Sequence, residues 1–196
     1  MFGVMRSSST TSARSLQVEE NAAIMKTIAV ANQKGGVGKT TTAINLSASL
    51  AKMHRRVLLV DLDPQANATG GCNIAREDVQ NSSYSVLLGL CQPHEAIVST
   101  TFGVDVLPAE PDLAGVQVEL ATAHDRDFRL RQSLGTLEQY DYVLIDCPPA
   151  LNMLTINALI AATSVLIPVQ CEYFALEGLS GLLETVSRVR QRHNPG

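Results

Sequence analysis

Short apolar runs alternate along the chain with longer segments of helical spacing. The β-rich run Thr27–Ala31 comes first, and Val57–Asp61 and Tyr142–Asp146 are apolar runs that each end in an acidic residue. Such runs are typical of central parallel strands, which are covered on both faces of their sheet. Two shorter strands are predicted near Val104–Leu107 and at Ser164–Val169.

The segments between these runs have the spacing of amphipathic helices. Thr40–His54 places one helical face at Ala43, Leu46, Leu50 and Met53. A final amphipathic helix is predicted at Ala175–His193, with its apolar face formed by Leu176, Leu179, Leu182, Leu183, Val186 and Val189. Further helices are expected around Ser85–Leu90, from Pro111 to Leu137 with a break near His124, and from Leu151 to Ala162, together with a turn at Gly70-Gly71.

Alternating strands and helices of these lengths predict an α/β fold, with helices on both faces of a mostly parallel sheet. The chain has 196 residues, of which 45% are hydrophobic and 17% charged, and its net charge is −4. That length and composition suit one globular domain and exclude a disordered or strongly basic protein. The longest apolar stretch, Ala158–Val169, is far shorter than the ~20 residues of a membrane span.

The first 24 residues differ from the rest of the chain. They contain the polar run Ser7–Ser12 with Arg6 and Arg14 nearby, and we expect this segment to be disordered. A targeting peptide is the alternative, although the segment is short and has no apolar core for secretion. The folded domain is expected to span residues 25–196, and Met25 is a candidate for the natural start.

A glycine-rich loop, Gln33–Thr41, lies where the first strand turns into the first helix, which is the context of a phosphate-binding loop. Backbone N–H groups of Gly35, Gly36, Val37 and Gly38 and the start of the helix would surround phosphate oxygens. Lys39 would place a cation on the β- and γ-phosphates, and Thr40 would offer its hydroxyl to Mg²⁺. The ordinary pattern GxxxxGK[ST] is not met, because its first glycine falls on Gln33, and the loop carries a second lysine, Lys34.

Acidic residues follow two of the apolar strands, at the sheet edge where open α/β sheets bind ligands. Asp61 and Asp63 follow the second strand, and strand alternation would point both to the same side. Two roles stay open for Asp61, namely a part in the chemistry or the holding of the loop or of a metal-bound water. Asp146 ends the strand that precedes Cys147-Pro148-Pro149.

Cysteine and histidine residues carry no site pattern. Cys72, Cys91, Cys147 and Cys171 are widely spaced without a CxxC pair, which fits reduced thiols better than disulfides or a zinc site. Cys147 has no histidine near it in the sequence, so neither a nucleophile nor a cluster ligand is expected there. The four histidines show no metal-ligand spacing and are expected at the surface.

The loop sequence KGGVGKTT is the deviant Walker A motif, and on it the chain resembles the ParA/MinD family of P-loop ATPases. The resemblance implies a P-loop NTPase fold of three α/β/α layers. It also implies that Lys34 reaches the partner's phosphates across a nucleotide-sandwich dimer, where a second cation stabilises charge during phosphoryl transfer. Local positive potential alone is the alternative role of Lys34.

The resemblance assigns further site residues. The stretch after Asp61 looks like switch I, in which Asp63 orients the attacking water. Asp146 matches the Walker B acid, which holds Mg²⁺ through a coordinated water. The expected catalytic residues are therefore Lys34, Lys39, Asp63 and Asp146, the expected nucleotide-binding residues are Lys34, Gly35, Gly36, Val37, Gly38, Lys39, Thr40 and Thr41, and the expected metal-binding residues are Thr40 and Asp146.

Two segments indicate the branch of the family. DLDPQANAT and IPVQCEYFALEG look like the ParA or Soj partition branch, whereas a MinD-like membrane helix and the cluster cysteines of the iron-protein branch have no counterpart. The resemblance implies a bacterial, cytoplasmic and nucleoid-associated ATPase that uses ATP and Mg²⁺. It further implies an ATP-dependent homodimer, non-specific DNA association, stimulation by a ParB-type partner, and no membrane association.

Family members normally continue past residue 196 through further strand and helix units, so the chain is expected to lack C-terminal units of the fold. Those units carry part of the adenine pocket and much of the DNA-binding surface. Arg188, Arg190, Arg192 and His193 form a basic helix end, for which favourable charge at a helix C-terminus is a simpler explanation than phosphate contact. Two hypotheses stand: an ATPase complete enough to cycle, or a fragment that binds nucleotide weakly or is an inert interaction module.

Overall fold

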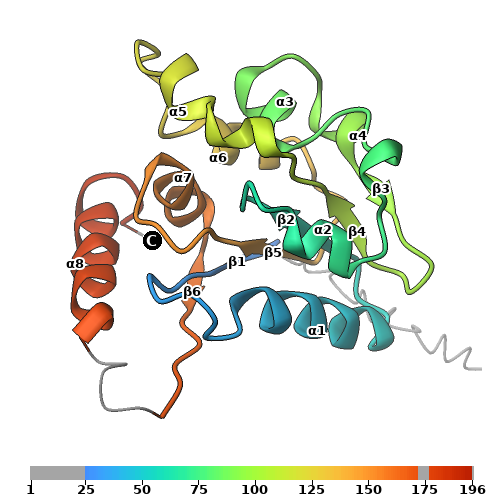
Figure 1. Ribbon diagram of the computed structural model, residues 1–196, viewed down its shortest axis with the longest axis horizontal. Coiled ribbons are helices and arrows are strands. Elements are labelled where there is room, and N and C mark those ends of the chain that lie inside the picture. The colour runs from blue at the N-terminus through green and yellow to red at the C-terminus, as the bar shows by residue number, and fades with distance from the viewer. Residues whose placement is uncertain (1–24, 172–176, 196) are drawn as a thin grey trace, which may run out of the picture.

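The computed structural model describes residues 25–171 and 177–195 and has a central six-stranded sheet with helices on both faces (Figure 1). The sheet order is β3-β4-β2-β5-β1-β6. The strands are β1 (Lys26–Val30), β2 (Val57–Asp61), β3 (Val98–Ser99), β4 (Asp105–Leu107), β5 (Tyr142–Asp146) and β6 (Ser164–Leu166). Only β3 pairs antiparallel, so the predicted mostly parallel α/β sheet is confirmed.

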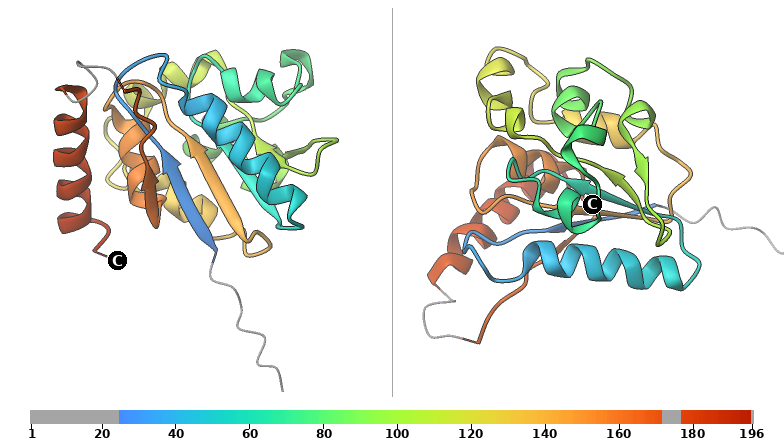
Figure 2. Two further views of the ribbon diagram at one scale, coloured as in Figure 1. Left: turned by 90° about the horizontal axis from the view of Figure 1, so that it is seen from below. Right: turned by 45° about the vertical axis from the view of Figure 1, so that its right-hand side comes forward.

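The helices form the outer layers of the fold. They are α1 (Lys39–Lys52), α2 (Asn67–Gly71), α3 (Ser83–Leu88), α4 (Pro93–Ala96), α5 (Val116–Glu119), α6 (Arg129–Leu134), α7 (Met153–Ala161) and α8 (Glu177–Arg192), with short 3-10 turns η1 (Arg76–Asp78) and η2 (Pro111–Ala114). In Figure 1, α1 runs along one face of the sheet and α3, α6 and α7 lie over the other. Figure 2 shows α8 at the β6 side of the sheet.

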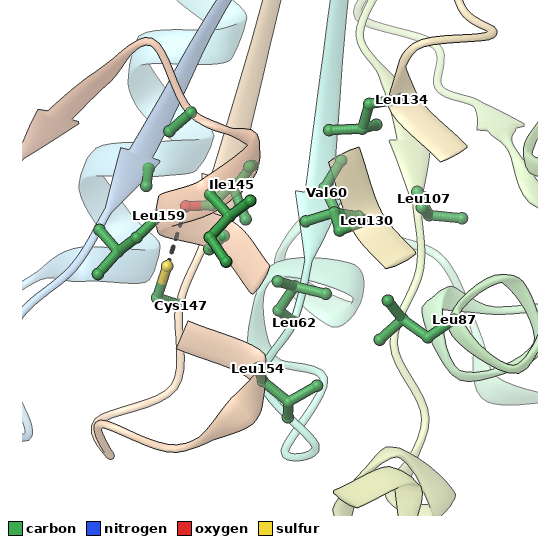
Figure 3. Close-up of a cluster of buried hydrophobic side chains, with 14 of the residues drawn as sticks. Val60, Leu62, Leu87, Leu107, Leu130, Leu134, Ile145, Cys147, Leu154 and Leu159 are labelled. Atoms are coloured by element: carbon green, nitrogen blue, oxygen red, sulfur yellow. Dashed lines mark hydrogen bonds between the residues drawn. The ribbon is translucent and has the colours of Figure 1, made fainter. Parts of the chain in front are cut away.

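The two faces of the sheet bury separate apolar clusters, because successive residues of a strand point to opposite faces. Val30 and Leu59 belong to the cluster under α1 and α2. Val60 and Ile145 belong to the larger cluster on the opposite face, where Leu130 of α6 and Leu154 and Leu159 of α7 gather with them (Figure 3). Each fully buried leucine contributes roughly 1.5–3 kcal/mol to stability.

The predicted central strands Val57–Asp61 and Tyr142–Asp146 occur with those bounds. All five residues of β2 are buried, as its continuous apolar run predicts. The remaining strand predictions are confirmed with small shifts at their ends, except that the predicted Ser164–Val169 strand stops at Leu166. The antiparallel edge strand β3 was not predicted, because it has only two residues.

Several helix predictions were wrong in detail. The helical stretch expected from Pro111 to Leu137 has the predicted break near His124, but its first part is divided into η2 and α5 and its second part is only the short α6. The apolar residues of this region, among them Leu113 and Leu130, are still buried. The turns between the helical pieces therefore let the segment follow the surface of the sheet. Gly70 and Gly71 end the helix α2 instead of forming a turn between elements.

The buried face of α1 also differs from the prediction. Ala43 is buried, but Met53 lies beyond the helix end and is 67% exposed. The second fully buried position of the helix is Ser47, whose small side chain lets α1 lie close to the sheet. In the predicted last helix, Leu182 and Val189 are buried while Leu183 is exposed. Its predicted start, Ala175 and Leu176, and the segment 1–24 lie outside the described residues.

Candidate functional site

The strands β1, β5 and β2 end side by side at one edge of the sheet. Their register pairs Val30 with Asp146 and Asp146 with Asp61. The glycine-rich loop leaves this edge directly after β1, and Asp63 follows Asp61 by two residues. The fold therefore brings the predicted phosphate loop and all three predicted acidic positions to one edge, the usual ligand-binding edge of an open α/β sheet.

The glycine-rich loop has the backbone shape of an open cradle. Gly36 and Gly38 have left-handed φ values of 73° and 91°, which favour glycine. A Cβ added to Gly35, Gly36 or Gly38 would meet nothing within 4 Å, so the space over the loop is open. The fourteen-residue helix α1 begins at Lys39 with no side-chain cap and no acidic residue in its first turn. Its N-terminal amides and positive dipole end therefore suit an anion.

The two lysines of the loop lie close together. Lys39 is only 7% exposed, and its Nζ donates a hydrogen bond of 3.3 Å to the backbone oxygen of Lys34. Lys34 is half-buried, and its backbone N–H donates a hydrogen bond of 3.0 Å to Oδ1 of Asn32. Val37 is buried and Thr40 half-buried, whereas Thr41 is exposed.

The loop is fastened to the segment that follows β6. Asn32 Nδ2 donates to the carbonyl of Pro168 at 2.8 Å, and Gln170 Nε2 donates to the carbonyl of Gly36 at 3.1 Å. A Cβ on Gly181 of α8 would contact the Gln33 side chain at 3.4 Å. Gln170 belongs to the IPVQCEYFALEG segment noted in the sequence, but its contact with the loop and the role of Asn32 were not predicted, because hydrogen bonds across about 134 residues leave no local pattern.

Asp61 is fully buried and hydrogen-bonded through both oxygens. Its Oδ1 accepts from the Asp63 N–H at 3.0 Å, and its Oδ2 accepts from the N–H and the hydroxyl of Thr69, both at 2.8 Å. Burial raises the pKa of Asp61, and the hydrogen bonds from Thr69 oppose that rise. Of the two roles left open by the sequence, these contacts are those of a residue that holds the loop.

Asp63 lies in the turn beyond β2, so strand alternation does not govern its direction. Its Oδ1 accepts from the N–H of Gln65 at 3.0 Å, and its backbone oxygen accepts from the N–H of Ala66 at 2.8 Å. The side chain is 9% exposed. Asp63 thus has a fixed backbone and a second carboxylate oxygen to offer to a ligand.

Asp146 is fully buried, and neither of its carboxylate oxygens has a hydrogen-bond partner among the described residues. Burial raises its pKa to about 7, and the negative charges of Asp61 and Asp63 act in the same direction. The Thr40 hydroxyl and the Lys39 ammonium lie near enough to lower this pKa in part. A buried carboxylate without a partner, beside a hydroxyl, fits a hydrated cation that supplies the missing contacts.

The described residues contain no group of three or more His, Cys, Asp or Glu side chains that could hold a metal ion. An ion at Asp146 would therefore depend on the Thr40 hydroxyl, waters and a bound phosphate, which is the usual way in which Mg²⁺ accompanies nucleotides. Within the same ranges, 25–171 and 177–195, no helix is long and apolar enough to cross a membrane.

The thiol of Cys147 takes no part in such a site. It is buried and donates from Sγ to the carbonyl of Ile145 at 3.8 Å (Figure 3). Burial and the neighbouring Asp146 raise its pKa, so it stays a thiol, which agrees with the expectation of no nucleophile there. The expected surface position holds for His54, His94 and His124, but His193 is half-buried with its ring edge-on to Phe128 at 5.4 Å.

A separate hollow of about 610 Å³ lies between α7 and α8, away from the phosphate loop. Its wall includes Arg126, Arg188 and Arg192. Arg188 pairs with Glu184 one helical turn earlier at 2.5 Å, and Arg190 and Arg192 lie in the last turn of α8. Basic residues in a last helical turn are favourable by themselves, so this rim is explained without a ligand.

Comparison with known proteins finds a matching family model and similar proteins. A family model described as an AAA domain matches residues 25–196. The chain is 54% identical over 170 residues to the sporulation initiation inhibitor protein Soj of Bacillus subtilis, covering 86% of this chain and 67% of that protein. It is 53% identical over 176 residues to the chromosome partitioning protein ParA of Myxococcus xanthus, covering 89% of this chain and 62% of that protein.

Solved structures of similar fold contain nucleotides. A Mycobacterium smegmatis protein described as cobyrinic acid a,c-diamide synthase, with bound ATP analog and magnesium, matches with a TM-score of 0.85 and 44% identity over 88% of this chain and 71% of that one. A plasmid partition protein of Borrelia burgdorferi bound to AMPPNP matches with a TM-score of 0.76 and 33% identity over 84% of this chain and 69% of that one. The chain spans just under two thirds of the length of several curated relatives, with shares of 62% to 66%.

Proposed function

The chain belongs to the ParA/Soj family of chromosome-partitioning P-loop ATPases, and from that premise we propose that it is itself a Mg²⁺-dependent ATPase that acts in chromosome or plasmid partitioning. One observation carries the proposal. The open glycine cradle at the start of α1 lies at the same sheet edge as Asp146, a buried carboxylate that has no partner among the described residues. A nucleotide phosphate with its cation satisfies both features at once.

In the proposed reaction, the chain binds the phosphates and positions a water. The backbone N–H groups from Gly35 to Thr41 surround the phosphate oxygens, and Lys39 places its ammonium on the β- and γ-phosphates. Asp63 accepts a hydrogen bond from the attacking water and so orients it toward the γ-phosphorus. The low exposure of Lys39 supports this arrangement, since a lysine in a water-poor site interacts more strongly with phosphate charge.

The residues fit Mg²⁺. The Thr40 hydroxyl and, through a water, the Asp146 carboxylate would hold it, and two related structures contain bound magnesium together with an ATP analog or ADP. When bound, Mg²⁺ supplies charge neutralisation to the transferring phosphoryl group. Burial and the negative charges of Asp61 and Asp63 raise the pKa of Asp146, so its charged form is unfavourable there, and a cation would reduce that cost.

Lys34 is proposed to act in a homodimer that forms when ATP is bound. It would reach the phosphates of the partner and stabilise charge there, as an arginine finger does. Its backbone N–H is fixed on Asn32, so the side chain starts from a defined place at the rim of the loop. The further properties proposed for the cycle are non-specific DNA association, stimulation by a ParB-type partner, and a cytoplasmic, nucleoid-associated location, which the ParA and Soj relatives support.

The test is ATP turnover by the purified chain, with and without DNA and a ParB-type partner, for the wild type, Lys39→Ala and Asp63→Ala. Both variants are expected to lose turnover, and Lys52→Ala, a matched lysine at the far end of α1, is expected to keep it. Light scattering with and without ATP would measure dimerisation. The alternative, weak nucleotide binding without turnover, is accepted if the wild type is no faster than both variants and forms no ATP-dependent dimer.

A further inference from the structure

Thr69, the last residue of the DLDPQANAT segment, lies in α2, is buried beside Asp61 and uses its hydroxyl twice. The hydroxyl donates to Asp61 Oδ2 at 2.8 Å and accepts from the N–H of Ala109 at 2.9 Å. The Thr69 N–H also donates to Asp61 Oδ2, at 2.8 Å. Thr69 is 3% exposed and Ala109 1% exposed, so water does not replace these contacts.

The two oxygens of Asp61 therefore hold the two ends of one segment. Oδ1 holds the N–H of Asp63, and Oδ2 holds Thr69, six residues further along the chain. Between them the chain makes a tight turn, closed by the bond from the Ala66 N–H to the Asp63 carbonyl, and Ala66 itself has a left-handed φ of 54°. A turn with a non-glycine residue in that conformation persists only when its surroundings fix it.

The Ala109 contact ties this segment to the sheet. Ala109 follows β4, which pairs with β2 in parallel, and the neighbouring Pro108 carbonyl accepts from the N–H of Ser83 at 2.7 Å. Thr69 is thus connected both to the end of β2, through Asp61, and to the end of the next strand, through Ala109. The segment has a rigid attachment on each side.

Asp61 is poorly suited to contact a ligand directly, because its two oxygens already accept three hydrogen bonds from the chain. We propose that Asp61 and Thr69 are positioning residues that set the place of Asp63 and so determine turnover without contributing to nucleotide affinity. The inference rests on the proposed function for the role of Asp63. A carboxylate that must meet a water in one geometry loses much of its effect when it moves by about 1 Å.

The experiment compares Thr69→Val, Thr69→Ser and Asp61→Asn with the wild type. Valine keeps the volume of threonine but removes the hydroxyl, serine keeps the hydroxyl, and the asparagine amide replaces one acceptor oxygen with a donor. We expect kcat to fall at least about tenfold in Thr69→Val and Asp61→Asn, with the equilibrium Kd for ATP within about twofold of the wild type. Thr69→Ser is expected to keep kcat within about threefold.

Thr163→Val is the matched control. The Thr163 hydroxyl also donates to a carbonyl and accepts from an N–H, both of Thr27, but it lies at the opposite edge of the sheet where β6 begins. Its loss is expected to lower the melting temperature without changing kcat at a temperature where the protein is folded. Equal kcat losses in Thr69→Val and Thr163→Val would overturn the proposal.

A double-variant comparison tests whether the effect passes through Asp63. In an Asp63→Ala background, Thr69→Val should lower kcat no further, because the carboxylate that it positions is already gone. A further tenfold loss there, or a fall in ATP affinity equal to the fall in kcat, would mean general damage and would reject the positioning role.

Hydrogen exchange gives a readout that does not depend on turnover. The backbone amides of residues 62–70, apart from Pro64, should exchange faster in Thr69→Val and Asp61→Asn than in the wild type. Their exchange rates should be unchanged in Thr69→Ser and Thr163→Val. If wild-type turnover does not exceed that of Lys39→Ala, the proposed function fails, and the exchange result alone decides whether Asp61 and Thr69 hold the turn. Unchanged exchange at residues 62–70 in Thr69→Val overturns the inference.

Discussion

Asp61 and Asp146 occupy paired positions at the ends of the adjacent parallel strands β2 and β5, and both are fully buried, yet only Asp61 has hydrogen-bond partners. Asp61 accepts three hydrogen bonds, whereas neither oxygen of Asp146 accepts one from the described residues. The chain itself fills the hydrogen-bonding capacity of Asp61, whereas that of Asp146 is open to a ligand. This difference leads to the first prediction.

Asp146→Asn is expected to raise the melting temperature of the nucleotide-free protein at pH 8, by roughly 2–6 °C, because it removes a buried charge that has no hydrogen-bond partner among the described residues and lies near the charges of Asp61 and Asp63. Asp61→Asn, at the paired position, is expected to lower it, because it breaks two hydrogen bonds. Thermal unfolding in EDTA measures both. A fall for Asp146→Asn as large as that for Asp61→Asn would contradict the contrast between the two sites.

The effect of Asp146 on the stability of the folded protein is expected to depend on pH. In the folded protein the Asp146 carboxyl keeps its proton up to a pKa of about 7, whereas the unfolded chain releases it near 3.8. Between these values the folded state binds more protons, so this group makes stability fall as pH rises. The stabilisation by Asp146→Asn should therefore be larger at pH 8 than at pH 5. An equal gain at both pH values would show that burial does not raise the pKa of Asp146 in the folded protein.

Gly38→Ala is expected to destabilise the phosphate loop, because Gly38 has a φ of 91° that an alanine adopts only at a cost of about 1–2 kcal/mol. That cost corresponds to a fall in melting temperature of roughly 2–8 °C. Gly35→Ala is the control in the same loop, since its φ is not in the left-handed region and its added Cβ meets nothing within 4 Å. Equal shifts in the two variants would show that the loop does not hold this conformation in solution.

Lys34→Ala is expected to keep ATP binding by the monomer and to lose hydrolysis. A hydrogen bond to a charged group contributes about 1.5–3 kcal/mol, so the loss should be roughly 10–100-fold in turnover. Equilibrium ATP binding, ATP turnover and light scattering together separate the two effects. Turnover equal to the wild type would reject the role of Lys34 across a dimer and leave only local positive potential.

Arg192→Gln tests the basic end of α8. Because Arg192 lies in the last turn, its loss should lower stability by about 0.3–1 kcal/mol. The slope of DNA affinity against salt concentration should stay unchanged, and Arg76→Gln in η1 is the matched exposed control. If Arg192→Gln alone lowered that slope by about one, Arg192 would contact a phosphate, and the helix-end explanation would be insufficient.

Local patterns predicted much of the fold. The bounds of β2 and β5 follow from apolar runs that end in an acid, since only a strand buried on both faces needs such a run. In the region from Pro111 to Leu137 the break near His124 was predicted, but the short lengths of η2, α5 and α6 were not, because apolar spacing reports burial and not where each helix ends. Met53 was assigned to the buried face of α1, although the helix ends one residue earlier and leaves it exposed.

The candidate site was also predicted only in part from the sequence. The residue types of the phosphate loop are apparent in the sequence because its glycines, lysines and threonines are consecutive and their chemistry depends on that order. The fastening of the loop by Asn32 and Gln170 was not apparent, because their partners, Pro168 and Gly36, lie more than 130 residues away along the chain.

The sequence by itself determined that two buried strands end in Asp61 and Asp146 near a phosphate-binding loop. It did not distinguish these two acids, since each follows an apolar strand in the same way. Only the tertiary structure decided their difference: α2 folds back so that Thr69 meets Asp61, and no described residue hydrogen-bonds to Asp146. The physical reason is that the hydrogen-bond donors around a buried carboxylate determine what it can bind, and the tertiary fold, not the local sequence, places those donors.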